Sequence, residues 1–237
     1  MWLKKTVAAV IPVSTNKDSI FNVIQGLDAT GYIDEIIVID NGVDAETLKE
    51  IKKTRARFIA QEKFGVGRAI RAGMKSTRAD LIIIIEPDGS FKDKDISKLL
   101  SYSEDFDTVF GSRTHVPLIG KGSGMTFSRR LVDDLFGKMI SLIFVSSNIT
   151  DVGCTLRLTN RRGWRMVAGE CKSDSEIFLT EWLVAAAKNK VRFIEIPVNF
   201  IAPKPKHKYE SFLYLSFRAV MIFIYVVKTW LMHQIRR

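Results

Sequence analysis

The chain has 237 residues, 46% of them hydrophobic, so it is long enough to bury one sizeable core in a single α/β domain. Its 36 Lys and Arg residues outnumber 26 Asp and Glu residues, and the net charge of +10 favours anionic partners such as phosphates or acidic lipid. Nucleic acid is not expected, because the basic residues form no arm and no nucleic-acid-binding motif is present. Cys154 and Cys171 are too few for a disulfide framework, which favours a reducing, cytosolic compartment.

The N-terminal half alternates apolar runs with helical patterns. Strands are predicted at residues 7–11, 35–40, 57–60 and 81–85, and helices at residues 19–29, 45–54 and 67–76. Such alternation indicates βαβ crossovers, a mostly parallel central sheet and an α/β fold. Ligands of these sheets bind beyond the carboxyl ends of the strands, which directs attention to the polar turns that follow each strand.

The C-terminal half continues with predicted strands at residues 106–110 and 191–198, and predicted helices at residues 131–145 and 175–188. We expect residues 1–203 to form the α/β domain and residues 204–237 to form a basic linker followed by an apolar helix. Arg218 and Lys228 interrupt that helix, whereas a membrane span needs about 20 apolar residues. A helix lying on the membrane surface therefore fits better than a span, and a helix packed on the domain or on a second subunit is the alternative.

Two carboxylates follow the most apolar predicted strand. Glu86 and Asp88, separated by Pro87, come directly after residues 81–85 and should lie at the rim of the sheet. Carboxylates in this position can hold Mg²⁺ or Mn²⁺, which prefer oxygen ligands and can bridge to a substrate diphosphate. The alternative is that acidic residues simply favour a turn in which Gly89 adopts a positive φ.

Asp40 ends the second predicted strand, where its carboxylate could bind a nucleobase or ribose, or could cap the helix after Gly42. Three glycines, Gly65, Gly67 and Gly73, do not have the spacing of a dinucleotide-binding loop. We expect them instead to open a helix and to let it pack closely.

Arginines lie at two further points near the predicted rim. Arg113 follows the strand at residues 106–110, and Arg129 and Arg130 precede the amphipathic helix. Guanidinium groups in such positions suit phosphate recognition, although a solvated surface charge is the ordinary explanation for any one of them.

Taken in order, these motifs resemble glycosyltransferase family 2, with its GT-A fold, over roughly residues 6–200. Within that family the chain is most similar to the dolichyl-phosphate mannose synthase and polyprenyl-phosphate glycosyltransferase group. The matching stretches are Val10-Ile11-Pro12-Val13, Ile37-Val38-Ile39-Asp40-Asn41-Gly42, Gly65 to Gly73, Glu86-Pro87-Asp88-Gly89, Gly111-Ser112-Arg113, Asp151-Val152-Gly153-Cys154-Thr155-Leu156-Arg157 and Glu195-Ile196-Pro197-Val198.

The resemblance implies roles for particular residues. Asp40 would contact the nucleobase and Pro12 would line its pocket. Glu86 and Asp88 would stand where the Asp-x-Asp motif of the family holds the divalent metal and the diphosphate, with Asp88 as the principal ligand. On the acceptor side, the matching residues are Arg113 and Arg130 for the phosphate and Glu181 for an acidic group facing the acceptor.

The chain also departs from the family pattern. Ser14-Thr15-Asn16-Lys17 replaces the usual Tyr-Asn-Glu, and Asn41 and Glu86 each replace a common Asp. A late Arg-x-x-Gly-x-Ser motif is missing, and lysines at residues 204–208 occupy its region. These departures leave the nucleotide and the acceptor open.

The expected function is metal-dependent transfer of a hexose-like sugar from a UDP- or GDP-sugar to a membrane lipid phosphate, with inversion at the anomeric carbon. The resemblance implies a polyprenyl or dolichyl phosphate acceptor. The cysteine usage and the basic, apolar tail predict a peripheral place on the cytosolic face of the membrane, and a homo-oligomer is left open. Two alternatives are a sugar nucleotidyltransferase of similar fold and a catalytically silent membrane-associated scaffold.

Overall fold

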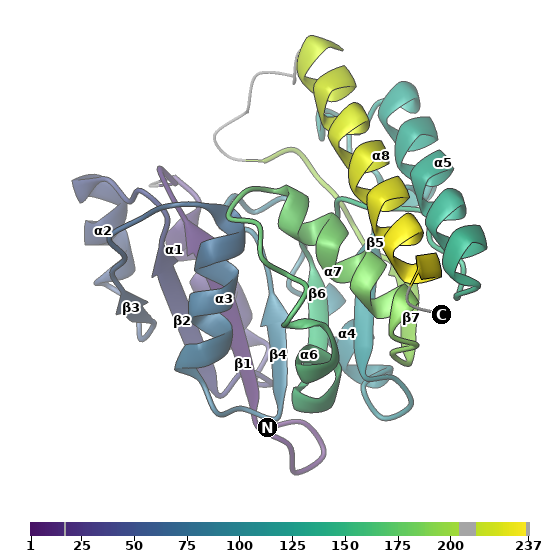
Figure 1. The fold of residues 1–237 in the computed structure, drawn as a ribbon. Helices are drawn as coiled ribbons and strands as arrows, with labels where there is room; N and C mark the ends of the chain where they lie inside the picture. Colours follow the sequence, from purple (N-terminus) through teal and green to yellow (C-terminus); the bar gives the residue numbers. More distant parts are fainter. Residues whose placement is uncertain (17, 204–211, 236–237) are drawn as a thin grey trace.

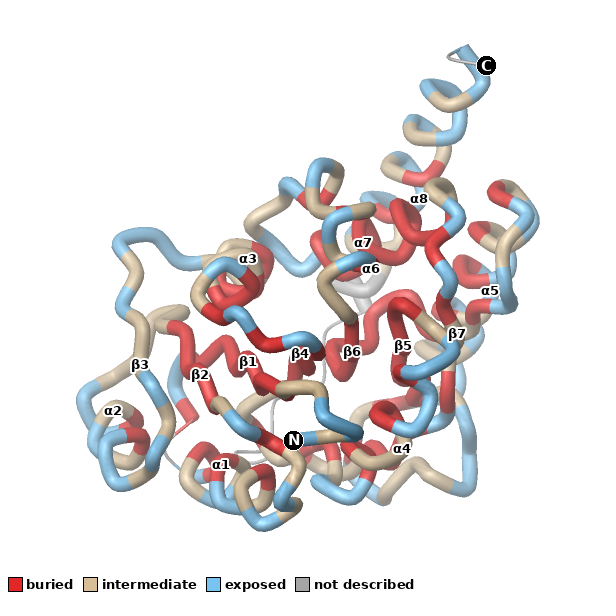
Figure 2. Tube along the Cα trace, turned by 90° about the horizontal axis from the view of Figure 1, so that it is seen from below, coloured by how far each residue is buried: buried red, intermediate tan, exposed pale blue. Residues whose placement is uncertain are grey.

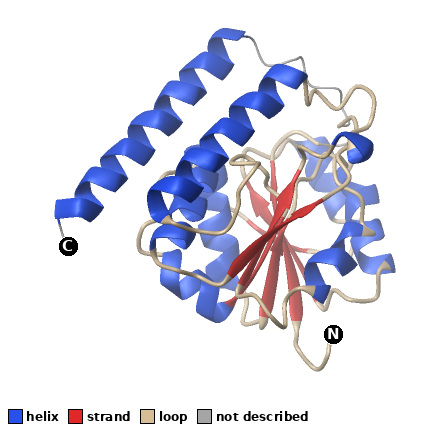
Figure 3. Ribbon diagram, turned by 90° about the vertical axis from the view of Figure 1, so that its right-hand side faces the viewer, coloured by secondary structure: helices blue, strands red, loops and turns tan. Residues whose placement is uncertain are grey.

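A mixed sheet forms the centre of the molecule, and helices cover both of its faces (Figures 1 and 3). The computed structural model describes residues 1–16, 18–203 and 212–235. Within these residues seven strands form one sheet in the order β3-β2-β1-β4-β6-β5-β7. Their bounds are Val7–Val13 (β1), Glu35–Asp40 (β2), Arg57–Ile59 (β3), Leu81–Ile84 (β4), Thr108–Ser112 (β5), Arg157–Asn160 (β6) and Phe193–Pro197 (β7).

Strand β6 is the exception to the common strand direction. It lies between β4 and β5 and is antiparallel to both, whereas the other pairs in the sheet are parallel. Strands β1, β2, β4 and β5 consequently end at the same edge of the sheet. The polar turns after these strands are thereby brought together.

The helices divide between the two faces of the sheet, as the view along the strands in Figure 2 shows. Side chains of α1, α2 and α4 pack in one apolar cluster, and those of α3, α5, α6, α7 and α8 pack in the other. Their bounds are Ile20–Ala29 (α1), Ala45–Ile51 (α2), Val66–Ser76 (α3), Asp95–Ser101 (α4), Phe127–Phe144 (α5), Arg161–Val167 (α6), Ile177–Lys188 (α7) and Phe212–Ile235 (α8), with a short 3₁₀ turn at Val116–Leu118.

Strand β1 shows why the sheet needs cover on both faces. Val10 packs in the cluster with α3 and α7, while the next residue, Ile11, packs in the cluster with α1 and α4. All seven residues of β1 are buried, as expected of a central parallel strand. Each fully buried Val or Ile contributes about 1.5–3 kcal/mol relative to an exposed one.

The three glycines predicted to open a helix and permit close packing do so in α3. Gly65 precedes the helix with φ 144°. A Cβ at Gly67 would lie 2.7 Å from the Cβ of Phe178 on α7, and a Cβ at Gly73 would collide with Val10 of β1. This part of the sequence prediction is confirmed.

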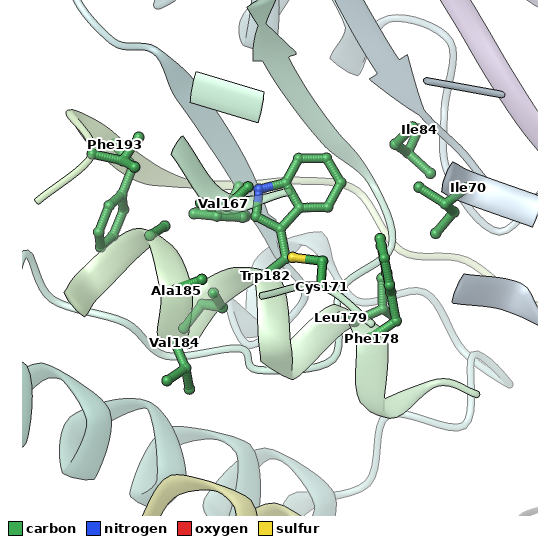
Figure 4. Close-up of a cluster of buried hydrophobic side chains, with 14 of the residues drawn as sticks. Ile70, Ile84, Val167, Cys171, Phe178, Leu179, Trp182, Val184, Ala185 and Phe193 are labelled. Carbon is green, nitrogen blue, oxygen red and sulfur yellow. The ribbon is translucent and has the colours of Figure 1, made fainter. Parts of the chain in front are cut away.

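Helix α7 is buried almost all round. Figure 4 shows its Trp182 among apolar side chains from several elements. The Trp182 ring centroid lies 5.0 Å from that of Trp164 and 6.0 Å from that of Phe178. This packing fixes the N-terminal end of α7, which faces the cavity described below.

Helices α5 and α8 lie side by side, and one face of each packs in the same cluster as α7 (Figures 1 and 3). Phe144 at the end of α5 is in ring contact with His233 at the end of α8, so the two helices run in the same direction. Ile222 and Val226 of α8 are buried, whereas its other face is exposed. No described helix is long and apolar enough to cross a membrane.

The structure adds elements that the sequence pattern did not predict. Strand β6 and helices α4 and α6 were missed, and α5 begins at Phe127 instead of residue 131. Strand β6 contains a single apolar residue, Leu158, and begins with Arg157, which is only 1% exposed. The predicted basic linker at residues 204–208 lies outside the described residues, as do Lys17, Arg236 and Arg237.

Candidate active site

A cavity of about 500 Å³ opens at the edge of the sheet where β1, β2, β4 and β5 end. Its lining contains charged side chains of both signs. Carboxylates come from Glu86, Asp88 and Glu176, and guanidinium groups come from Arg113, Arg129 and Arg218. The remaining described lining residues are mostly small or apolar: Pro12, Ser14, Asn16, Asn41, Val66, Pro87, Gly122, Ser123, Gly124, Thr126, Gly153, Thr155, Leu179, Phe200 and Pro203.

Glu86 and Asp88 both face this cavity from the turn after β4. The Thr155 hydroxyl donates a hydrogen bond to Oε1 of Glu86, and the backbone N–H of Ser90 donates to Oδ1 of Asp88 over 2.9 Å. Burial of the carboxyl group, followed by repulsion from Asp88, raises the pKa of Glu86 to about 7 against the opposing effect of the Thr155 bond. Burial and mutual repulsion make the ionised forms of these two carboxylates unfavourable, and a cation bound between them would offset this free-energy cost.

This pair fits a divalent cation. Mg²⁺ is commonly bound through one or two carboxylates together with substrate phosphates. Asp88 is 6% exposed and lines the cavity, so a cation here would meet both protein oxygen atoms and a diphosphate. The described residues contain no group of three or more His, Cys, Asp or Glu side chains that could hold a metal by themselves.

Of the two residues predicted to contact the nucleoside, Pro12 lines the cavity, whereas Asp40 lies at the end of β2, before the turn that follows it. Asp40 Oδ1 accepts hydrogen bonds from the N–H groups of Gly42 and Val43 at 2.9 and 3.0 Å, so this carboxylate closes the turn. It does not cap α2, whose N-terminus is capped by Asp44. Among the described residues that line the cavity are Pro12 and Asn41, not Asp40, and nucleoside binding by Asp40 stays a prediction.

Arg113 reaches the cavity from the end of β5 and is held by Asp151. Nε and Nη2 of Arg113 each donate to a different oxygen of Asp151 at 2.8 Å, and the backbone N–H of Arg113 adds a third bond of 2.8 Å. The guanidinium carbon lies 5.2 Å from the ring centroid of Phe200. Burial opposes ionisation of Asp151, but the charge and hydrogen bonds of Arg113 outweigh it and lower the pKa of Asp151 to about 2.

The two arginines at the start of α5 have different surroundings. Arg129 lines the cavity, whereas the guanidinium carbon of Arg130 lies 5.7 Å from the ring centroid of Phe127. Arg130 is not among the described residues lining the cavity. Acceptor binding by Arg130 stays a prediction, and the structure makes Arg129 the nearer candidate.

Glu181 holds a loop. Its Oε2 accepts hydrogen bonds from the N–H groups of Lys172 and Ser173, both at 2.8 Å. Among the described residues, Glu176 at the start of α7 lines the cavity and Glu181 does not. The role of Glu181 toward an acceptor stays a prediction.

Two charged residues of the cavity were missed by the sequence prediction. The first is Glu176, which precedes a helix that looks like buried core in its apolar pattern. The second is Arg218, which belongs to α8 and is separated in sequence from every other charged lining residue. For Arg218 the signal was present, because a lone Arg in an apolar helix needs a partner or solvent.

The sheet order, the antiparallel β6 and the carboxylate turn after β4 define a glycosyltransferase of the GT-A fold. The chain belongs to glycosyl transferase family 2, whose family model matches residues 9–148, and it is a glycosyltransferase. Membership of this family does not favour the sugar nucleotidyltransferase that the sequence left as an alternative.

Several proteins of similar sequence are named as glycosyltransferases that use dolichyl phosphate. The UDP-N-acetylglucosamine–dolichyl-phosphate N-acetylglucosaminyltransferase of Methanococcus voltae is 24% identical over 220 residues, 83% of this chain and 86% of that protein. The dolichyl-phosphate beta-glucosyltransferase of Saccharomyces cerevisiae is 24% identical over 189 residues, 70% of this chain and 56% of that protein.

Solved structures agree on the fold. Glucosyl-3-phosphoglycerate synthase from Mycobacterium tuberculosis, crystallised with Mg²⁺ and UDP, superposes with a TM-score of 0.73 at 14% identity, over 96% of this chain and 79% of that one. Another crystal of that enzyme contains Mn²⁺ and UDP.

Proposed function

We propose that this glycosyltransferase moves a sugar from a nucleoside-diphosphate donor to a lipid phosphate such as polyprenyl phosphate. The observation that carries the proposal is the cavity itself, in which Glu86 and Asp88 share one space with Arg113, Arg129 and Arg218. Carboxylates suit a metal-bound diphosphate, and arginines suit a phosphate acceptor. The names of the relatives support a dolichyl-phosphate-like acceptor and, in one case, a UDP-sugar donor.

In the proposed reaction an oxygen of the acceptor phosphate forms a bond to the anomeric carbon of the sugar. The bond from that carbon to the donor diphosphate breaks, and the nucleoside diphosphate leaves with the electron pair, which gives inversion. A phosphate oxygen is already nucleophilic, so no strong general base is required. Mg²⁺ or Mn²⁺ at Glu86 and Asp88 would neutralise charge on the leaving diphosphate.

The residues around the reacting groups have separate tasks. Asp88 orients the diphosphate end of the donor, and the Thr155 hydroxyl fixes the rotamer of Glu86 beside it. Arg113 offers guanidinium N–H donors whose orientation is set by Asp151. Phe200 and Leu179 give the cavity wall its apolar part.

We also propose that the enzyme works at the cytosolic surface of a membrane through α5 and α8. The outer faces of these helices expose large apolar side chains: Phe127, Leu131, Val132, Leu135 and Leu142 on α5, and Phe217, Val220, Met221, Phe223, Ile224, Leu231 and Ile235 on α8. An apolar surface of this extent on a basic protein suits the interface of an anionic bilayer. Arg129 and Arg218, near the starts of the same two helices, line the cavity, so a lipid phosphate at this surface would lie close to it.

The activity is tested by a screen of UDP- and GDP-sugars against polyprenyl phosphate in liposomes with Mn²⁺. We expect a glycosyl lipid phosphate detectable by mass spectrometry with one class of donor. Absence of that product with every donor, combined with transfer to a soluble phosphate or glycan, would refute the lipid acceptor.

The membrane surface is tested separately with Leu135→Glu and Ile224→Glu, on α5 and α8. Each should weaken cosedimentation with anionic liposomes. Tyr102→Glu, an exposed aromatic residue on the opposite face of the sheet, serves as the matched control. Wild-type cosedimentation of both α5 and α8 variants would refute membrane binding through these helices.

A further inference from the structure

Helix α8 delivers one charged side chain to the cavity. Arg218, Ile222 and Val226 are spaced by four residues and therefore lie on one face of the helix. Ile222 and Val226 are 2% and 0% exposed and form part of the core, which directs this face inward. The packing of α8 against α5 and α7 thus places Arg218 at the wall of the cavity.

Arg218 meets Arg113 at Gly153. A Cβ at position 153 would collide with Nη2 of Arg218 and would lie 3.2 Å from Nη2 of Arg113. The two guanidinium groups therefore approach the same point, over a backbone that has no side chain. Because Gly153 has no side chain, it leaves the guanidinium groups of Arg113 and Arg218 uncovered on the cavity side.

The two charges are compensated differently. Arg113 is paired with Asp151, and this pair is neutral as a unit. Arg218 is half-buried and is attracted by the carboxylate of Asp133, but it makes no hydrogen bond or salt bridge with any described residue. A cation that is partly removed from water and has no hydrogen-bonded counter-ion gains from an anion within hydrogen-bond reach, and a phosphate between it and Arg113 would supply one.

We propose that Arg218 is a ligand for a substrate phosphate group, so that α8 completes the active site. This inference rests on the proposed function for the identity of the substrate. The phosphate has two possible sources, the lipid acceptor and the diphosphate of the donor. Both would use the same charge-assisted hydrogen bonds, and separate measurements distinguish them.

The test uses Arg218→Gln and Arg218→Lys in the full chain, with Lys228→Gln as the matched control. Lys228 is exposed on the same helix, so its replacement removes the same charge from α8 without touching the cavity. Three quantities are measured: the KM for polyprenyl phosphate in liposomes, the Kd of farnesyl phosphate by calorimetry, and the Kd of UDP or GDP with Mn²⁺. Farnesyl phosphate gives a reading that does not depend on turnover.

Loss of a charge-assisted bond should weaken phosphate binding by about tenfold or more in Arg218→Gln. Arg218→Lys should restore part of the affinity, and Lys228→Gln should leave it within about twofold. Gly153→Ala keeps every charge but displaces the Arg218 guanidinium, so it should behave like Arg218→Gln.

A change confined to the acceptor readings assigns Arg218 to the lipid phosphate, and a change in nucleotide affinity assigns it to the donor diphosphate. Unchanged values for both ligands in Arg218→Gln would overturn the proposal. Failure of the proposed function looks different, because wild-type protein would then neither turn over polyprenyl phosphate nor bind farnesyl phosphate. In that case the nucleotide measurement still decides whether Arg218 binds phosphate.

Discussion

Asp151→Asn should destabilise the protein strongly, because it leaves the Arg113 charge buried without a counter-ion. Arg113 is 3% exposed and Asp151 is 1% exposed, and three hydrogen bonds of 2.8 Å join the two residues. Asp151 also accepts a bond from the N–H of Gly153 at 3.1 Å. An Asn amide can keep some of these bonds but none of the charge.

The magnitude follows from two lines of reasoning. The pKa of Asp151 falls from an ordinary 3.8 to about 2, and a shift of that size corresponds to about 2 kcal/mol. Breaking a buried ion pair by removing one partner costs more, about 3–5 kcal/mol, because the remaining charge has lost its compensation. We expect the larger figure, since Arg113 stays ionised at any accessible pH.

Thermal and urea unfolding of the full chain measure this cost. For a protein of this size the loss corresponds to a fall in Tm of roughly 6–20 °C. Asp134→Asn is the control, because its partner Lys138 is 58% exposed and the pair should contribute no more than about 0.5 kcal/mol. If Asp151→Asn unfolds within about 1 kcal/mol of wild type, the ion pair does not hold the Arg113 side of the cavity as described.

Three further predictions concern single carboxylates. Asp88→Asn should abolish metal-dependent transfer while leaving Tm within a few degrees, and unchanged turnover and manganese dependence would remove Asp88 from the metal site. Asp40→Ala should weaken UDP or GDP binding in calorimetry if Asp40 contacts the nucleoside, whereas wild-type affinity would leave it as the residue that closes its turn. Burial, followed by repulsion from Asp151, raises the pKa of Asp133 from 3.8 to about 6, so its contribution to stability is present below pH 4 and lost as the pH rises through 6. Asp133→Asn should therefore gain up to about 3 kcal/mol over wild type at pH 8 and little at pH 4, and equal unfolding curves at both pH values would contradict this.

The sequence predicted the parallel part of the fold because its signal is local. Strands β1, β2 and β4 are short apolar runs that end in polar turns, and the intervening helices have amphipathic patterns. The same pattern placed Glu86 and Asp88 at the rim, where the structure has them. Position along a strand is enough for such residues, since the end of a parallel strand is already the location of the site.

The antiparallel strand β6 was not predictable in this way. Its four residues, Arg157–Asn160, form no apolar run, and only tertiary contacts make Arg157 a core residue. Nε and Nη1 of Arg157 donate to the carbonyl groups of Cys154 and Leu179, and its guanidinium carbon lies 5.0 Å from the ring centroid of Phe110. No single stretch of sequence contains these partners.

The sequence could not predict which glutamate near the start of α7 faces the cavity. Glu181 and Glu176 lie five positions apart near the start of α7, and the resemblance singled out Glu181. In the structure two backbone N–H groups donate hydrogen bonds to the Glu181 carboxylate, while Glu176 lines the cavity. The choice depends on the path of the loop at residues 172–173, which the sequence does not reveal.

Arg218 of helix α8 is a residue whose role the sequence analysis did not predict. Arg218 was counted only as a charge that disfavours a membrane span, and its position on the same face as Ile222 and Val226 was not used. That face is the inner one, so the charge that weakens a membrane span is the charge that reaches the cavity. Removing the whole tail would therefore uncover the core and delete a cavity residue at once. Point substitutions such as Arg218→Gln and Ile224→Glu separate these effects, because one changes the inner face of α8 and the other its exposed face.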